Sequence, residues 1–157
     1  MNKQYAEQFE DNDYKLLQDF NEKKLKLKNL GRTPNKYSSD ASGYTQDNQQ
    51  VNIELKYRDN DINEYDSLHI ETHKAYDLLD EYIRENKIPL YINFLNDGHV
   101  VVYNLAKLKH KPYKKRVKTY SKLYQDYESG YKAFLKLEDA YIYKKENDNY
   151  KRIVLYS

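Results

Sequence analysis

The chain has 157 residues, with 27 Lys and Arg against 25 Asp and Glu, and a formal net charge of +2. Because the sequence contains no cysteine, it excludes a disulfide framework, a cysteine-ligated zinc site and a thiol nucleophile. No apolar run reaches the ~18 residues of a membrane span, and the polar N-terminus has no signal-peptide core. We therefore expect no membrane partner and a cytoplasmic location, in a bacterium or a phage-infected cell.

Tyrosine is unusually abundant, with 19 Tyr against 4 Phe. Any core of adequate size must use these rings, and a buried tyrosine needs a partner for its hydroxyl. We predict a sheet-rich core with hydrogen-bonded tyrosines, inside a single domain over residues 1–157.

The N-terminal half has one long helical pattern and one clear strand. Apolar residues recur at helical spacing over 4–28, and turn-forming residues fill 35–50. Segment 51–58 alternates strictly and predicts a strand, which a short strand at 67–70 follows. Thr72 can cap a helix that runs to residue 86 and turns four apolar side chains inward: Ala75, Leu79, Tyr82 and Ile83.

The C-terminal half reads as strands interrupted by a basic connector and a helix. We predict strands at 89–94 and 99–105, joined by a turn at Asn96-Asp97-Gly98. Residues 106–116 form the connector. Apolar residues at spacings of three and four predict a helix over 117–135, and a hairpin over 139–145 and 150–156 closes the chain.

The pattern acid-x-Lys occurs four times, which is close to the roughly 3.5 occurrences expected by chance for this composition. Only Glu54-Leu55-Lys56 lies in a predicted strand. There a spacing of two places both side chains on one face, ~6.5–7 Å apart along the chain. The motif alone therefore does not indicate a site, but its position in a strand does.

Such a pair suits metal-assisted hydrolysis of a phosphodiester. Mg²⁺ prefers oxygen ligands, which Asp40, Glu54 and the backbone carbonyl of Leu55 can supply. Lys56 beside the metal can orient and help deprotonate a water and stabilise charge on the phosphoryl oxygens.

These residues resemble the motifs of the PD-(D/E)xK (restriction-endonuclease-like) nuclease superfamily. Asp40 matches its first motif position, with Ser39 in place of the usual proline, and Glu54 and Lys56 match the second. The resemblance covers residues 4–106 and is closest in size and layout to small Holliday-junction-resolvase-like members. It implies a core of helix, strand hairpin, helix and further strands, Mg²⁺ or Mn²⁺ as cofactor, and a metal-side role for Glu7 on the first helix.

Several of these assignments have rivals. Asp47 competes with Asp40 for the first acidic position, although its segment reads as a turn. Lys74 either faces the same cleft or is a solvated lysine. His69 and His73 have a spacing that could bind zinc on a helix, but a strand-to-helix boundary is expected between them.

Residues 107–122 contain no acidic residue and are expected to contact nucleic-acid phosphates, or else to be a solvated charge run. The eight cationic residues are Lys107, Lys109, Lys111, Lys114, Lys115, Arg116, Lys118 and Lys122.

The prediction from sequence is therefore an α/β domain of restriction-endonuclease-like type. A mixed central sheet is flanked by helices over 4–106, and 107–157 add a basic segment, a helix and a β-hairpin. The expected activity is a Mg²⁺-dependent DNA endonuclease, with branched or junction DNA as the leading substrate and a homodimer through the helix at 117–135. The alternatives are a non-catalytic nucleic-acid- or protein-binding accessory (phage or virion) protein that keeps this fold, and a different α+β module whose Glu54 strand is solvated surface.

Overall fold

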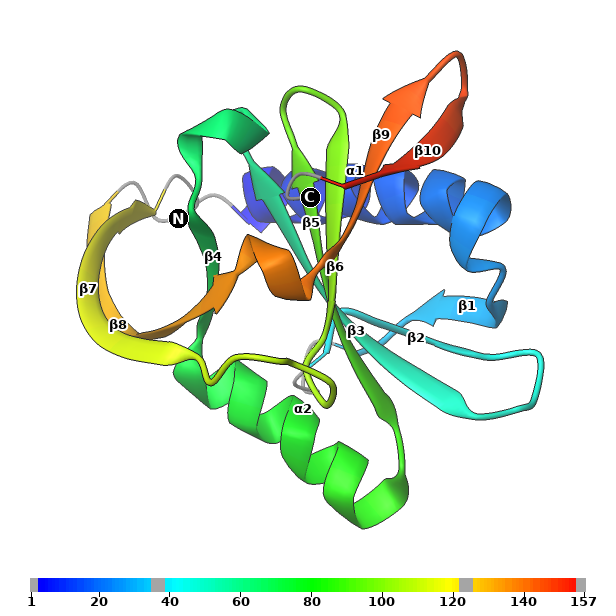
Figure 1. Ribbon diagram of the computed structural model, residues 1–157, viewed down its shortest axis with the longest axis horizontal. Coiled ribbons are helices and arrows are strands. Elements are labelled where there is room, and N and C mark those ends of the chain that lie inside the picture. The colour runs from blue at the N-terminus through cyan, green and yellow to red at the C-terminus, as the bar shows by residue number, and fades with distance from the viewer. Residues whose placement is uncertain (1–2, 35–38, 122–125, 155–157) are drawn as a thin grey trace.

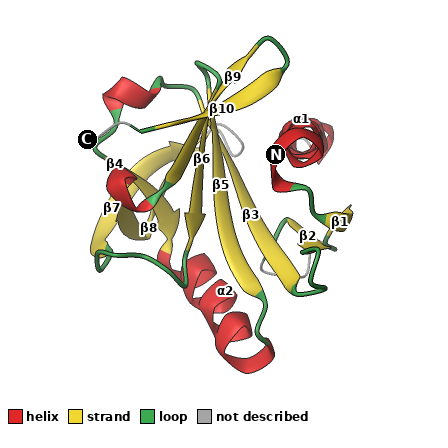
Figure 2. Cartoon of the chain, turned by 45° about the vertical axis from the view of Figure 1, so that its right-hand side comes forward, coloured by secondary structure: helices red, strands yellow, loops and turns green. Residues whose placement is uncertain are grey.

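A computed structural model describes residues 3–34, 39–121 and 126–154, and side chains within 12–34, 39–118 and 130–154. Within these residues two sheets form, of seven and three strands (Figures 1 and 2). The larger, central sheet has the order β1 (Lys28–Arg32), β2 (Ala41–Tyr44), β3 (Gln50–Arg58), β5 (Ile88–Leu95), β6 (His99–Asn104), β9 (Tyr141–Glu146) and β10 (Asn149–Ile153). The small sheet has the order β4 (Ser67–Glu71), β8 (Asp126–Lys136) and β7 (Tyr113–Ser121).

The central sheet is mixed and carries a helix on each face. Helix α1 (Lys3–Phe20), continued by a π-helical turn at Asn21–Leu25, packs Leu17 and Phe20 on one face. Helix α2 (Thr72–Glu85) and the small sheet cover part of the other face. The predicted fold class, a mixed central sheet flanked by helices, is confirmed.

The connection from β3 to β5 sets the position of the site. β3 pairs antiparallel with β2 and parallel with β5, so the chain must cross over between β3 and β5. The crossover contains a short 3-10 helix (Ile62–Glu64), β4 and α2. This order of helix, hairpin, helix and strand is the one that the resemblance implied.

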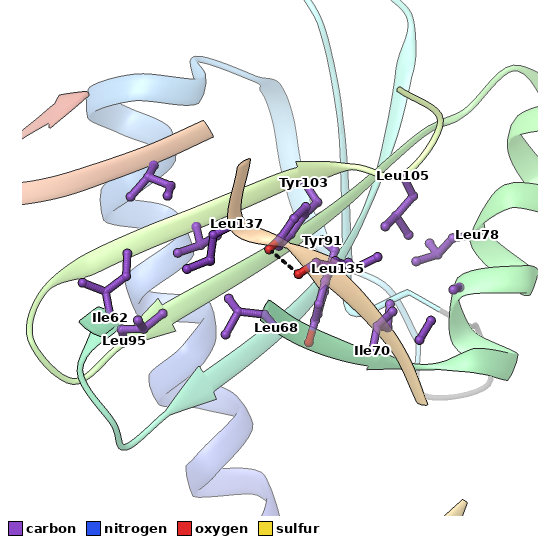
Figure 3. Packing of buried hydrophobic residues seen from close by; sticks show 14 residues of the cluster. Ile62, Leu68, Ile70, Leu78, Tyr91, Leu95, Tyr103, Leu105, Leu135 and Leu137 are labelled. Atoms are coloured by element: carbon purple, nitrogen blue, oxygen red, sulfur yellow. Dashed lines mark hydrogen bonds between the residues drawn. The ribbon is translucent and has the colours of Figure 1, made fainter. Parts of the chain in front are cut away.

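Tyrosine rings fill the core as composition predicts. Tyr91, Tyr103 and Tyr150 are at most 3% exposed. Each hydroxyl donates a hydrogen bond: to the carbonyl of His69 (2.6 Å), to the carbonyl of Leu135 (3.2 Å) and to Asp19 Oδ2 (2.5 Å), respectively. The bond from Tyr103 to Leu135 joins the central sheet to the small sheet. It lies within a hydrophobic cluster that also contains Leu68, Ile70 and Leu78, which we call the first hydrophobic cluster (Figure 3).

The prediction of a helix over 117–135 is wrong. Its residues form strands β7 and β8, which pair from Tyr113 with Phe134 to Ser121 with Asp126. Aromatic residues at spacings of three and four fit a helical stripe, but they are equally common in strands, and β8 is held in place by its pairing with β4. A segment this rich in tyrosine therefore carries a weak periodicity signal.

The other differences are smaller. The first helix ends earlier than predicted, because Lys26 adopts a left-handed conformation (φ 58°) and β1 begins at Lys28. Helix α2 has the predicted extent, but Glu71 stands at its N-cap and Thr72 makes no capping hydrogen bond. Its buried side chains are Ala75 and Leu78, while Ile83, predicted to point inward, is 79% exposed. The C-terminal hairpin is confirmed, and β9 pairs with β6 to extend the central sheet.

The two faces of α2 predict a clear difference in stability between two variants. Leu78→Ala should lower the free energy of unfolding by about 2–4 kcal/mol, because Leu78 is fully buried between α2 and both sheets. Ile83→Ala should change it by less than about 0.5 kcal/mol. Urea denaturation measures both values, and similar losses for the two variants would contradict this packing of α2.

Candidate functional site

The polar face of β3 is buried, in contrast to the solvated face that one alternative required. Asn52, Glu54 and Arg58 are 3%, 4% and 7% exposed, and only Lys56 between them is exposed. These side chains share their sheet face with Tyr91 and Asn93 of β5, which lie beside Glu54 and Lys56 in register. The crossover through β4 and α2 covers part of this face, so the charged side chains of Glu54 and Arg58 lie inside the protein.

Asp40 lies beside Glu54, directly before β2. The backbone N–H of Asp40 donates to the carbonyl of Ile53 (2.8 Å), and the N–H of Leu55 donates to Asp40 Oδ2 (2.8 Å). The charge of Asp40 also raises the pKa of Glu54, because the two carboxyl groups lie near each other. In a strand the N–H and C=O of one residue point to the same side, so the Leu55 carbonyl points toward Asp40. The two carboxyl groups therefore lie near each other where β2 begins, with the Leu55 carbonyl on the same side of β3.

Three further charged residues surround this pair. Lys74 Nζ on α2 lies 3.1 Å from Glu54 Oε1 and 3.9 Å from Glu71 Oε2. Lys132 Nζ on β8 lies 3.5 Å from Glu71 Oε1. Lys74 is thus paired with Glu54, although its side chain is 38% exposed. Sequence reasoning missed Glu71 and Lys132, because the pairing of β4 with β8 that brings them together depends on the hairpin that was read as a helix.

The environment shifts the pKa values of the central groups. Burial, followed by the charge of Asp40, raises the pKa of Glu54 to about 8. Burial also raises the pKa of Asp40, against the Leu55 N–H bond and the charge of Lys74, which lower it. The pKa of Lys56 is lowered by the surrounding protein and by the nearby charges of Arg58, Lys132 and Lys74. Two adjacent carboxyls that favour sharing a proton, next to a lysine that gives up its proton more readily, are typical of a reactive site.

Arg58 holds the covering layer against β3. Its Nε donates to Asn93 Oδ1 (2.9 Å), and its Nη2 donates to the carbonyl of His69 (2.7 Å) and to Tyr91 Oη (3.0 Å). The same charge, after burial, helps to lower the pKa of His69 to about 4, so this imidazole is neutral. Arg58 thereby fixes β4, with Glu71 at its end, next to Glu54 and Lys56.

The remaining predicted residues lie in several places. Glu7 belongs to α1, but its side chain is outside the described residues, as is Lys122. Asp47, the rival of Asp40, lies in the turn between β2 and β3. The seven other cations of the basic segment are exposed, three in the loop after β6 and four on β7: Lys107, Lys109, Lys111, Lys114, Lys115, Arg116 and Lys118.

The histidines form no zinc site. His69 lies in β4 and His73 in α2, so the boundary expected between them is present, and His73 Nε2 lies 3.4 Å from Glu71 Oε2. Among the described side chains, no three or more His, Asp or Glu residues gather as a metal cluster. A metal at the Asp40–Glu54 pair would thus rest on two carboxylates, a backbone carbonyl and water, a ligand set that suits Mg²⁺.

Comparison with solved structures gives a distant likeness. No protein-family model and no curated protein matches the sequence. A Holliday junction resolvase of the archaeal hyperthermophile Archaeoglobus fulgidus aligns with a TM-score of 0.42 and 12% sequence identity. The alignment covers 66% of this chain and 66% of that one, just under two thirds of each. We therefore base the functional proposal on the residues of this chain. None of the helices in the described part of the chain is long and apolar enough to cross a membrane.

The raised pKa of Glu54 predicts a pH-dependent gain of stability in Glu54→Gln. The folded state favours protonated Glu54, so the wild type loses stability as pH rises from about 4.5, the ordinary value, through about 8. Glutamine does not ionise, so the variant should be more stable than wild type by on the order of 2 kcal/mol at pH 9, with a smaller difference at pH 5.

Urea denaturation at pH 5, 7 and 9 measures this difference, with the exposed Glu64→Gln as the matched control. A difference that stays constant or shrinks as pH rises would contradict the burial of an ionisable Glu54.

Proposed function

We propose that this protein is a divalent-metal-dependent nuclease that hydrolyses phosphodiester bonds of DNA. The observation that carries the proposal is the position of Asp40 beside the buried carboxyl of Glu54 on β3, with Lys56 two residues along the same face. Burying the Glu54 carboxyl next to the carboxyl of Asp40 destabilises a fold unless a cation or a proton offsets its charge. An arrangement that disfavours stability in this way is characteristic of a functional site.

Asp40, Glu54 and the Leu55 carbonyl would hold the metal, Mg²⁺ or Mn²⁺, which supplies Lewis-acid stabilisation of the phosphoryl oxygens. Lys56 would orient the attacking water and accept its proton, which its lowered pKa favours. Lys74 and Lys132 add positive charge within the same cluster and suit a phosphate group. Glu7 stays a predicted metal-side residue.

The basic segment would hold the DNA backbone. Its described cations are exposed, and four of them lie on β7, the edge strand of the small sheet, which curves together with β8 (Figure 1). Such a surface binds phosphates independently of sequence. Branched or junction DNA remains the predicted substrate. The predicted dimer interface was the helix at 117–135, and because those residues form strands, we propose no dimer through them.

One observation favours the alternative function, a binding protein that keeps this fold without catalysis. Lys74 already pairs with Glu54 at 3.1 Å, so the ammonium group balances the carboxylate. In a binding protein without catalytic activity, the ammonium group of Lys74 would occupy the position of the metal permanently. The two functions make different predictions for cleavage and the same prediction for DNA binding.

Cleavage assays with Lys56→Ala separate the two functions. Supercoiled, linear and four-way-junction DNA are incubated with Mg²⁺ or with EDTA. The nuclease proposal expects cleavage in Mg²⁺ only, and a rate at least about 100-fold lower in Lys56→Ala. Lys151→Ala, an exposed lysine on β10, should cleave like wild type. Retention of DNA without cleavage by the wild type would reject the nuclease in favour of the binding protein.

Salt dependence tests the role of the basic segment. Replacing Lys107, Lys109 and Lys111 together by alanine should make the slope of log K against log [salt] shallower by about 2 to 3 for duplex DNA, because each phosphate contact contributes about 0.9. Anisotropy titrations in EDTA between low and moderate salt give the slope. An unchanged slope would show that this loop does not contact DNA.

A further inference from the structure

The small sheet presents a row of aromatic rings on one face. Leu68, Ile70, Ala133 and Leu135 point into the first hydrophobic cluster, so the alternate residues of β4 and β8 point away from it. Among these, His69 pairs in register with Phe134, and Phe134 with Tyr113 of β7. The ring centroids are 5.5 Å apart for His69 and Phe134 and 6.4 Å apart for Phe134 and Tyr113. We call these three residues the aromatic row.

The aromatic row is accessible. Tyr113 is 67% exposed, and His69 and Phe134 are half-buried. The imidazole of His69 is neutral, since burial and the nearby cations lower its pKa to about 4. These flat, uncharged rings, one from each strand, therefore line a face of the sheet that lies outside the hydrophobic cluster.

A second row on the same face carries charge and leads to the candidate site. This second row lies two residues along each strand from the aromatic row, a distance of about 6.5–7 Å. It consists of Glu71, Lys132 and Lys115, which are side by side in register. Lys132 pairs with Glu71, Glu71 lies near Lys74, and Lys74 pairs with Glu54. A continuous series of close charged groups thus connects the face of the small sheet to the carboxyl pair.

Rings beside cations indicate an unpaired nucleic-acid strand. Bases stack on aromatic side chains when they are free of a partner strand, while lysines bind the phosphates that link them. In a duplex the bases are stacked on one another, so their faces are not available to these rings. An acidic peptide would use the lysines but would gain little from three flat rings.

We propose that the aromatic row binds unpaired bases of a single-stranded DNA segment, with the exposed Lys115 on its phosphates, next to the Asp40–Glu54 pair. This inference rests on the proposed function, because it makes that strand part of the nuclease's substrate. It adds a substrate class, which is DNA with an unpaired segment near the cleaved bond.

The opposite face of the same hairpin supplies a matched control. Tyr131 lies opposite Arg116 on the face that also carries Lys114, whose Nζ lies 4.4 Å from the centre of the Tyr76 ring on α2. Tyr131 is 63% exposed, close to the value for Tyr113. Removing either ring should leave the fold intact, so only the position of the ring differs between the two variants.

The test is fluorescence anisotropy in EDTA with a labelled oligothymidine and a labelled hairpin duplex of equal charge. Tyr113→Ala should weaken binding of the single strand about tenfold and leave binding of the duplex within about twofold. Tyr131→Ala should leave both within about twofold, and Tyr113→Trp should retain the wild-type affinity. Thermal melting of each variant confirms that it is folded.

Three results would overturn the inference. The wild type could fail to bind the single strand, the two alanine variants could weaken it equally, or Tyr113→Ala could weaken the duplex as much as the single strand. Because EDTA prevents metal-dependent cleavage, the outcome is separate from the nuclease test. A protein that binds through the row and never cleaves would refute the proposed function alone, and one that cleaves while Tyr113→Ala binds normally would refute the inference alone.

Discussion

The buried guanidinium of Arg58 is the interaction on which the arrangement of the site depends. Its hydrogen bonds to Asn93, Tyr91 and the His69 carbonyl join two strands of the central sheet to β4. Unpaired, this buried charge would be strongly destabilising, so the three partners are held in a narrow range of positions. Through β4 the same contacts place Glu71, and with it Lys74 and Lys132, beside Glu54. The two sheets, the crossover and the site are therefore fixed together.

The charged groups around Glu54 lower the stability of the fold, and the proposed metal site would depend on these same groups. The Glu54 carboxyl is buried on a face that an apolar side chain could have filled, and replacing buried charged groups by apolar residues is often neutral or stabilising. The pKa of Glu54 is raised because burial and Asp40 both disfavour its charge. In the proposed site the same features would favour binding of a cation, since the buried Glu54 carboxylate gains from a positive charge that water screens poorly.

Sequence reasoning identified the centre of the site but not its surroundings. The strict alternation of 51–58 was enough to predict the strand that carries Glu54 and Lys56, and the resemblance added Asp40, which lies beside this strand. Lys74 stayed open between the site and solvent. Glu71 and Lys132 could not be assigned, because their proximity depends on pairing between strands distant in sequence. The tyrosines of 117–135 fit both helical and strand spacing, and only the register with β4 decides between them. Ile83 was misplaced because the apolar stripe of α2 is short and two alternative faces fit it.

The central claim is that Asp40 and Glu54 bind one divalent metal ion. Titration of Mn²⁺ by electron paramagnetic resonance at pH 8.5, above the pKa of about 8 of Glu54, tests it directly, since metal ligands must be deprotonated. Wild type and Asp47→Asn, the matched control from the neighbouring turn, should bind one ion per chain, and Asp40→Asn should bind it about tenfold more weakly or worse. Equal affinity in Asp40→Asn and wild type, or no bound Mn²⁺ in wild type, would contradict the account.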